Sequence, residues 1–178
     1  LPPRDYVRWR MYTAYGDATG FDSFVSDKLS NGLAQVPGAA ADFSGVNVRT
    51  ATGEFTSDGR SGRKASGLLM VDGVLYLLAR NLDNAQLAWS RDHGATWTWA
   101  DWKFTTSFGC PTFLNFGKNY AGARDDFVYV YSADSDDAYE PADRMVLARV
   151  PKDRITQRNA YEFFVAIDAS GQPTWSKD

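Results

Sequence analysis

The stretch SRDHGATW, residues 90–97, decides the fold of this chain. It follows the pattern Ser-x-Asp-x-Gly-x-Thr-Trp, in which the aspartate can accept hydrogen bonds from turn amides and the glycine supplies a positive φ. The threonine and the tryptophan then fix the hairpin to an apolar core. The pattern therefore predicts an architectural hairpin turn, with a structural role for Asp92 and a solvated loop position for His93.

On both sides of this turn the apolar residues recur with a period of two. Residues 68–71 and 74–78 are separated by Asp72-Gly73, a dipeptide that readily takes positive φ and predicts a tight hairpin. Further segments are rich in aromatic and β-branched residues and are bounded by Gly, Asp, Asn and Pro. These segments are residues 8–15, 46–49, 86–90, 96–103, 127–132, 145–150 and 162–167. A sustained helical period is absent, so we expect an all-β fold of short antiparallel hairpins.

The composition of the 178 residues excludes several classes of protein. A hydrophobic content of 44% with 23% charged residues is that of a globular chain with a core. The 19 Lys and Arg against 22 Asp and Glu give a net charge of −3, so we expect neither nucleic acid nor a membrane as a partner. One cysteine and one histidine exclude an internal disulfide and a Cys- or His-based metal site.

Six segments resemble successive signatures of one bacterial β-propeller family. They are MYTAYGD (11–17), GRKASG (62–67), ARN (79–81), SFGCPTFLNFG (107–117), ARD (123–125) and YEFF (161–164). The family was long labelled only as a domain of unknown function, and its relatives include endo-acting D-arabinan hydrolases. Residues 90–97 are also similar to the Asp-box of sialidase-like β-propellers. The resemblance implies a secreted or cell-envelope-associated β-propeller that handles polysaccharide.

Two features depart from this family pattern. Family members usually carry an acidic run ahead of the segment 12–17, whereas this chain has DYVRWR at residues 5–10. If that run supplies catalysis in the relatives, this chain has lost it. A closed propeller needs at least about four blades of roughly 40–50 residues, whereas the predicted strands correspond more nearly to three. We therefore expect residues 1–178 to form a single propeller domain, partial at about three to four blades, whose exposed strand edges could self-associate.

Glycosidic hydrolysis needs two carboxyl groups, and three lie in family-like segments. Asp17, Asp125 and Glu162 are therefore the predicted catalytic residues, brought together at one end of the propeller axis. The alternative is that Asp17 and Asp125 cap turn amides and that Glu162 pairs with Arg124 or Arg144.

Four basic or amide residues in the same segments could bind sugar hydroxyls or an anionic group. They are Lys64, Arg80, Asn81 and Arg124, and they would serve equally well as ion-pair partners between blades. Asp134-Ser135-Asp136-Asp137 resembles a calcium loop in its spacing but lacks the glycine and the terminal glutamate of an EF-hand. We therefore expect no cofactor and no metal site, with a structural cation such as calcium as the alternative for this loop.

These observations predict a glycoside hydrolase acting on an arabinan-like polysaccharide or oligosaccharide. The alternative is a carbohydrate-binding or scaffold propeller without catalysis. A third hypothesis is a polysaccharide lyase, for which only Tyr15, Tyr120 and Arg124 offer a base and a cation.

Overall fold

The computed structural model describes residues 12–14, 21–23, 33–35, 63–81 and 83–178. Within these ranges every regular element longer than a single 3₁₀ turn is a β-strand. The two 3₁₀ turns are η1 (Lys118–Tyr120) and η2 (Arg158–Ala160). The all-β prediction is thus confirmed for the described part of the chain.

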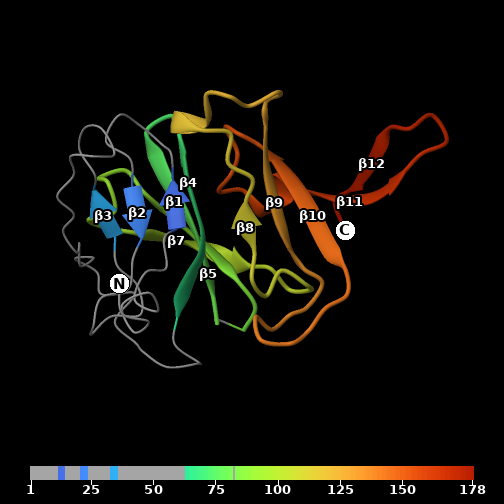
Figure 1. Ribbon diagram of the computed structural model, residues 1–178, viewed down its shortest axis with the longest axis horizontal. Coiled ribbons are helices and arrows are strands. Elements are labelled where there is room, and N and C mark those ends of the chain that lie inside the picture. Colours follow the sequence, from blue (N-terminus) through green and yellow to red (C-terminus); the bar gives the residue numbers. More distant parts are fainter. Residues whose placement is uncertain (1–11, 15–20, 24–32, 36–62, 82) are drawn as a thin grey trace, which may run out of the picture.

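The strands form three antiparallel sheets, and each sheet is a meander in chain order (Figure 1). The first contains β1 (Tyr12–Ala14), β2 (Phe21–Ser23) and β3 (Leu33–Gln35). The second contains β4 (Lys64–Val71), β5 (Val74–Arg80), β6 (Gln86–Ser90) and β7 (Thr98–Lys103). The third contains β8 (Thr112–Phe113), β9 (Phe127–Ala133), β10 (Met145–Pro151), β11 (Glu162–Ile167) and β12 (Pro173–Ser176). Such meanders are compatible with a partial propeller or with a stacked sandwich.

The β4–β5 hairpin confirms the turn that the sequence predicts. Asp72 and Gly73 have φ angles of 49° and 75°, and positive values at both central residues are what a type I′ turn requires. All seven residues of β5 are buried, so the second sheet is covered on both faces. A continuous apolar run, rather than an alternating one, is what such a doubly covered strand needs.

The main core fills the space between the second and third sheets. From β4 and β5 it takes Leu69 and Leu78, and from β9 and β10 it takes Val130 and Val150. The fully buried Tyr161 crosses this core, and its phenol donates a 2.8 Å hydrogen bond to the carbonyl of Ile155. Burial raises the pKa of Tyr161, so this donor keeps its proton in the folded protein.

A second apolar cluster lies on the opposite face of the second sheet, the side on which β1 contacts β4 (Figure 1). It includes Leu68, Leu75 and Leu77, together with Trp97, which is 6% exposed. The tryptophan that ends the stretch 90–97 is therefore a core residue, as the pattern predicts.

The C-terminal hairpin β11–β12 projects away from the rest of the third sheet (Figure 1). β11 pairs with β10 at only two positions, Ala148 with Phe163 and Arg149 with Glu162. Beyond Phe163 the hairpin is held together mainly by its own ladder, in which Phe164 pairs with Trp175.

None of the helices in the described ranges has the length and apolar character to cross a membrane.

Candidate functional site

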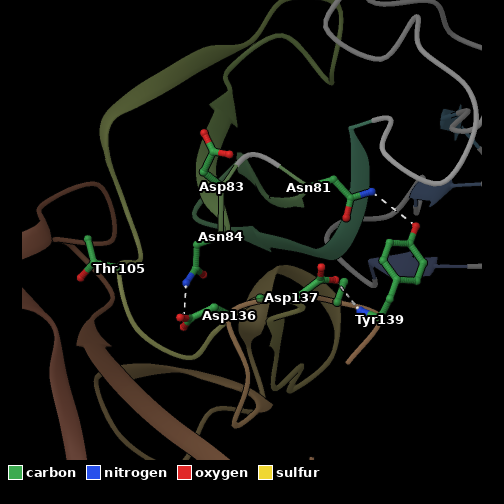
Figure 2. A pocket seen from close by; sticks show the side chains of 9 residues that line it. Asn81, Asp83, Asn84, Thr105, Asp136, Asp137 and Tyr139 are labelled. Carbon is green, nitrogen blue, oxygen red and sulfur yellow. Dashed lines mark hydrogen bonds between the residues drawn. The ribbon is translucent and has the colours of Figure 1, made fainter. Parts of the chain in front are cut away.

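Three loops meet at one end of the second and third sheets and enclose a polar cavity of about 550 Å³ (Figure 2). They are the loops that join β5 to β6, β7 to β8 and β9 to β10. The cavity is lined by two side-chain amides, three carboxylates, a hydroxyl and a phenol, with small residues between them. The lining residues are Asn81, Asp83, Asn84, Thr105, Gly109, Asp136, Asp137, Ala138 and Tyr139.

The close approach of two of these loops depends on Gly109. Its amide donates a 2.8 Å hydrogen bond to the carbonyl of Ser135. A Cβ atom at Gly109 would lie 2.5 Å from the backbone oxygen of Asp136, a distance that no side chain tolerates. Glycine at this position therefore allows the acidic loop to form one wall of the cavity.

The acidic residues of the β9–β10 loop have separate partners. Asp136 accepts a 3.3 Å hydrogen bond from the amide nitrogen of Asn84, and Asp137 accepts one of 2.8 Å from the backbone amide of Tyr139 (Figure 2). Asp134 accepts a bond from the Ser107 hydroxyl. In the described ranges there is no group of three or more His, Cys, Asp or Glu side chains able to hold a metal ion.

Three of the predicted binding residues converge on Tyr139 at the edge of this cavity. Asn81 donates a 3.4 Å hydrogen bond to the phenol oxygen (Figure 2), and the Arg80 guanidinium lies 4.9 Å from the ring centroid. Lys64 pairs with Arg80 across β4 and β5. Burial alone would raise the pKa of Tyr139, but the Asn81 hydrogen bond and the charges of Arg80 and Lys64 lower it overall.

The two described members of the predicted catalytic set lie elsewhere, on the outer face of the third sheet. Asp125 accepts a 2.9 Å hydrogen bond from the amide of Phe127 and a 2.6 Å bond from the Tyr129 hydroxyl. Both the Nε and the Nη2 of Arg149 lie 2.8 Å from one carboxylate oxygen of Glu162. Because Tyr129 and Arg149 are paired across β9 and β10, these contacts form one network.

The pKa of Tyr129 is influenced from both sides of this network. Burial and the hydrogen bond to Asp125 raise the pKa of the Tyr129 phenol, whereas the charge and hydrogen bond of Arg149 lower it. We name Asp125, Tyr129, Arg149 and Glu162 the outer-face network. Glu162 is thus paired with Arg149, and not with Arg124 or Arg144, the partners that sequence reasoning considered.

Arg149 is also enclosed by aromatic rings. Its guanidinium lies 4.3 Å from the ring centroid of Phe127 and 4.1 Å from that of Trp175. These cation–π contacts and the Glu162 pair hold the base of the β11–β12 hairpin against the third sheet. The sequence gives no sign of them, because they depend on which strands become neighbours.

The structure thus separates the predicted site residues into different places. Asp125 lies just before β9, whereas the loop that lines the polar cavity comes just after this strand. Asp125 and the cavity are therefore about 20 Å apart, which is the length of a seven-residue strand. Arg124 lies with Asp125 and Lys152 beside another hollow, of about 540 Å³, near the start of β9. Asp17 lies outside the described residues.

The turn in the stretch 90–97 is organised around Asp92. Its Oδ1 accepts a 2.6 Å hydrogen bond from the Ser90 hydroxyl and a 2.9 Å bond from the Thr96 amide. The Ser90 hydroxyl oxygen in turn accepts a 2.8 Å bond from the Gly94 amide. The hydrogen bonds from Ser90 and Thr96 lower the pKa of Asp92 to about 2. This exposed carboxylate is a structural acceptor, as predicted.

We expect Asp92→Ala to lower the melting temperature by several degrees at neutral pH, because the amide and hydroxyl donors of the turn lose their acceptor. The pKa of Asp92 is lowered from 3.8 to about 2, so its contribution is complete above pH 3.8 and is lost as the pH falls through about 2. Melts of both proteins between pH 7 and pH 2 should therefore converge at the acidic end. A difference in melting temperature that is constant with pH would contradict this role.

Comparison with known proteins gives little. No family model matches the chain, and no curated protein matches it. Among solved structures it is similar to the phage phi92 endosialidase, with a TM-score of 0.47 and 15% sequence identity. The match covers 76% of this chain, which spans only 21% of the endosialidase.

Proposed function

We propose that the protein binds carbohydrate and that the polar cavity holds the glycan. The observation that carries this proposal is the lining of the cavity, in which amides, carboxylates, a hydroxyl and a phenol surround about 550 Å³. A volume of this order is typical of sites that take a small ligand or a short segment of a larger one. Sugar hydroxyls both donate and accept, and this lining offers both kinds of partner.

The placement of the family-like segments supports this site. Residues 62–67 contain Lys64, residues 79–81 contain Arg80 and Asn81, and residues 107–117 contain Gly109. All of these residues line the cavity or surround Tyr139 at its edge. The resemblance extends the proposal to an arabinan-like polysaccharide as ligand and to a secreted or cell-envelope location in a bacterium.

The test is calorimetric binding of a polysaccharide panel that includes arabinans. We expect Tyr139→Ala to weaken binding about tenfold, because the variant loses both a phenol hydrogen bond and a ring surface for the sugar. Tyr131→Ala is the matched control: both tyrosines are 37% exposed, but Tyr131 lies on the outer face of the third sheet. Equal weakening by both substitutions, or a wild-type protein that binds no member of the panel, would refute the proposal.

A second candidate function is glycoside hydrolysis by Asp125 and Glu162, with Asp17 as a further predicted participant. The observation in its favour is the outer-face network, which joins two residues 37 positions apart (162 − 125) on one face of one sheet. Against it, both carboxylates already accept hydrogen bonds from protein donors. Release of reducing sugar from the same panel detects this activity.

A further inference from the structure

Arg80 is a buried cation at the end of the second sheet. It is the last residue of β5, and it is only 9% exposed. Within the described ranges no carboxylate forms an ion pair with its guanidinium, which lies 4.9 Å from the centroid of the Tyr139 ring. A buried charge is costly to keep unless an opposite charge and hydrogen bonds compensate for it. Among the described residues, Arg80 therefore has no counter-charge.

A second cation lies directly beside Arg80. Lys64 is the first residue of β4 and stands opposite Arg80 in the ladder between β4 and β5. Residues directly opposite each other in antiparallel strands have Cβ atoms about 4.5–5.5 Å apart on the same face, so like charges at such positions repel each other. The repulsion adds to the cost of burying Arg80, and an anion bound between the two side chains would remove it.

Two of the carboxylates that line the polar cavity already have donors of their own. Asp136 accepts a 3.3 Å hydrogen bond from the side-chain amide of Asn84. Asp137 accepts a 2.8 Å hydrogen bond from the backbone amide of Tyr139. Neither of them forms an ion pair with Arg80, although Tyr139 contacts both the cavity and the guanidinium. The acidic loop therefore does not neutralise the buried cation.

The phenol of Tyr139 lies in the positive field of the two cations. Burial acts to raise its pKa, but the Asn81 hydrogen bond and the charges of Arg80 and Lys64 lower the pKa overall. The interaction that favours a phenolate here would equally favour the carboxylate of a ligand. The place where an anion is favoured is thus at the edge of the polar cavity, beside Asn81 and Tyr139 (Figure 2).

We propose that the polar cavity takes an acidic glycan, one that carries a carboxylate such as that of a uronic acid, and that Arg80 and Lys64 bind this carboxylate. The inference rests on the proposed function and narrows its ligand to an acidic class. A guanidinium presents two parallel N–H groups to the two oxygens of a carboxylate, and the ammonium adds a further donor. The Tyr139 phenol can donate to the same group. The hydroxyls of the sugar then contact the polar lining of the cavity.

The first test changes the charge of the ligand and leaves the protein unaltered. Calorimetry compares short oligomers of galacturonate, glucuronate and mannuronate with the methyl esters of the same oligomers. We expect at least one acid to bind at least about tenfold more tightly than its ester, because the ester keeps the sugar and loses the charge. Equal affinity of acid and ester for every oligomer overturns the inference.

A neutral arabinan in the same series separates this inference from the proposed function. If the protein binds arabinan and no acid binds better than its ester, the cavity still holds a glycan but the acidic ligand is wrong. If the protein binds neither arabinan nor any oligomer, both the proposed function and the inference fail.

The second test removes the guanidinium. Arg80→Met keeps a long side chain and should abolish the preference for acid over ester, while the affinity for the ester stays close to that of the wild type. Arg63→Met is the matched control, because the same charge is lost beside Lys64 from an exposed side chain that lies 5.8 Å from the Trp99 ring centroid. Neighbouring residues of an extended chain point to opposite faces, so this control should keep the preference. An equal loss of preference in both variants contradicts a specific role of Arg80.

Melting temperatures show whether Arg80 has a structural role instead. Because its guanidinium is buried without a counter-charge, Arg80→Met should leave the melting temperature of the ligand-free protein unchanged or raise it. The oligomer that binds best should raise the melting temperature of the wild type more than that of Arg80→Met. A ligand-free Arg80→Met variant that melts several degrees below the wild type would identify Arg80 as a structural residue and overturn the inference.

Discussion

Replacing Tyr161 by alanine is expected to lower the free energy of unfolding by about 3–5 kcal/mol, the range for removing a large aromatic side chain from a core. The side chain is fully buried. Its ring makes edge contacts with Trp102 and Phe104 at centroid distances of 5.3 and 5.9 Å. Loss of the ring leaves a cavity where the second and third sheets meet, and urea denaturation of the variant measures the cost.

Tyr161→Phe is the matched control, because it keeps the ring and removes only the hydroxyl. That hydroxyl donates to the buried carbonyl of Ile155, so this variant should lose about 1–3 kcal/mol. The difference between the two variants then gives the contribution of ring packing. An alanine variant no less stable than the phenylalanine variant would show that the rings do not hold the sheets together.

The strands with clear patterns were predictable from sequence. The predicted segments 86–90 and 162–167 have the same bounds as β6 and β11. The turn at Asp72-Gly73 was identified from backbone preference alone. These elements carry apolar residues at a regular spacing or a dipeptide of unusual conformational freedom, so local sequence was sufficient.

Two short strands of the third sheet were missed for a physical reason. β8 contains only Thr112 and Phe113, which pair with β9. β12 begins at Pro173, a residue that argues against a strand except at its first position. Both strands form because they pair with the free edge of a longer neighbouring strand. The local sequence does not show whether such an edge is available.

The site was partly predictable. Lys64, Arg80 and Asn81 were predicted together with Arg124 as binding residues, and the structure places the first three around Tyr139. Tyr139 itself was missed, because it lies in an irregular acidic loop whose path is fixed by the Gly109 contact. Proximity across three loops depends on strand direction and loop course, and neither follows from residue type.

The separation of Asp125 from Arg80 has the same origin. Asp125 comes before its strand, whereas Asn81 and Arg80 come at the end of theirs. Whether such residues meet depends on whether their strands run in the same or in opposite directions through neighbouring sheets. The segments alone contain no information on that relation, so the sequence does not show whether Arg80 lies near Asp125.

Glu162→Gln is the substitution that tests the hydrolase candidate most sharply. If Glu162 transfers a proton in glycosidic cleavage, the amide should lower kcat by about 100- to 10,000-fold. Asp125→Asn should have a comparable effect if the two carboxylates act as a pair. The measurement is initial release of reducing sugar at saturating polysaccharide, where a loss of binding does not mimic a loss of chemistry.

The same substitution also has a structural effect, which Arg149→Met separates from catalysis. Glu162 and Arg149 have side chains that are 28% and 23% exposed, so breaking their pair should lower stability by about 1–2 kcal/mol. If Glu162 is only structural, Glu162→Gln and Arg149→Met destabilise to a similar extent, their effects are not additive in the double variant, and turnover is unchanged. If Glu162 is catalytic, Glu162→Gln removes turnover, whereas Arg149→Met retains it, because the carboxyl group that transfers the proton is still present. These two sets of results exclude each other. The variants therefore decide whether the Glu162 carboxylate anchors the projecting hairpin or takes part in glycosidic cleavage.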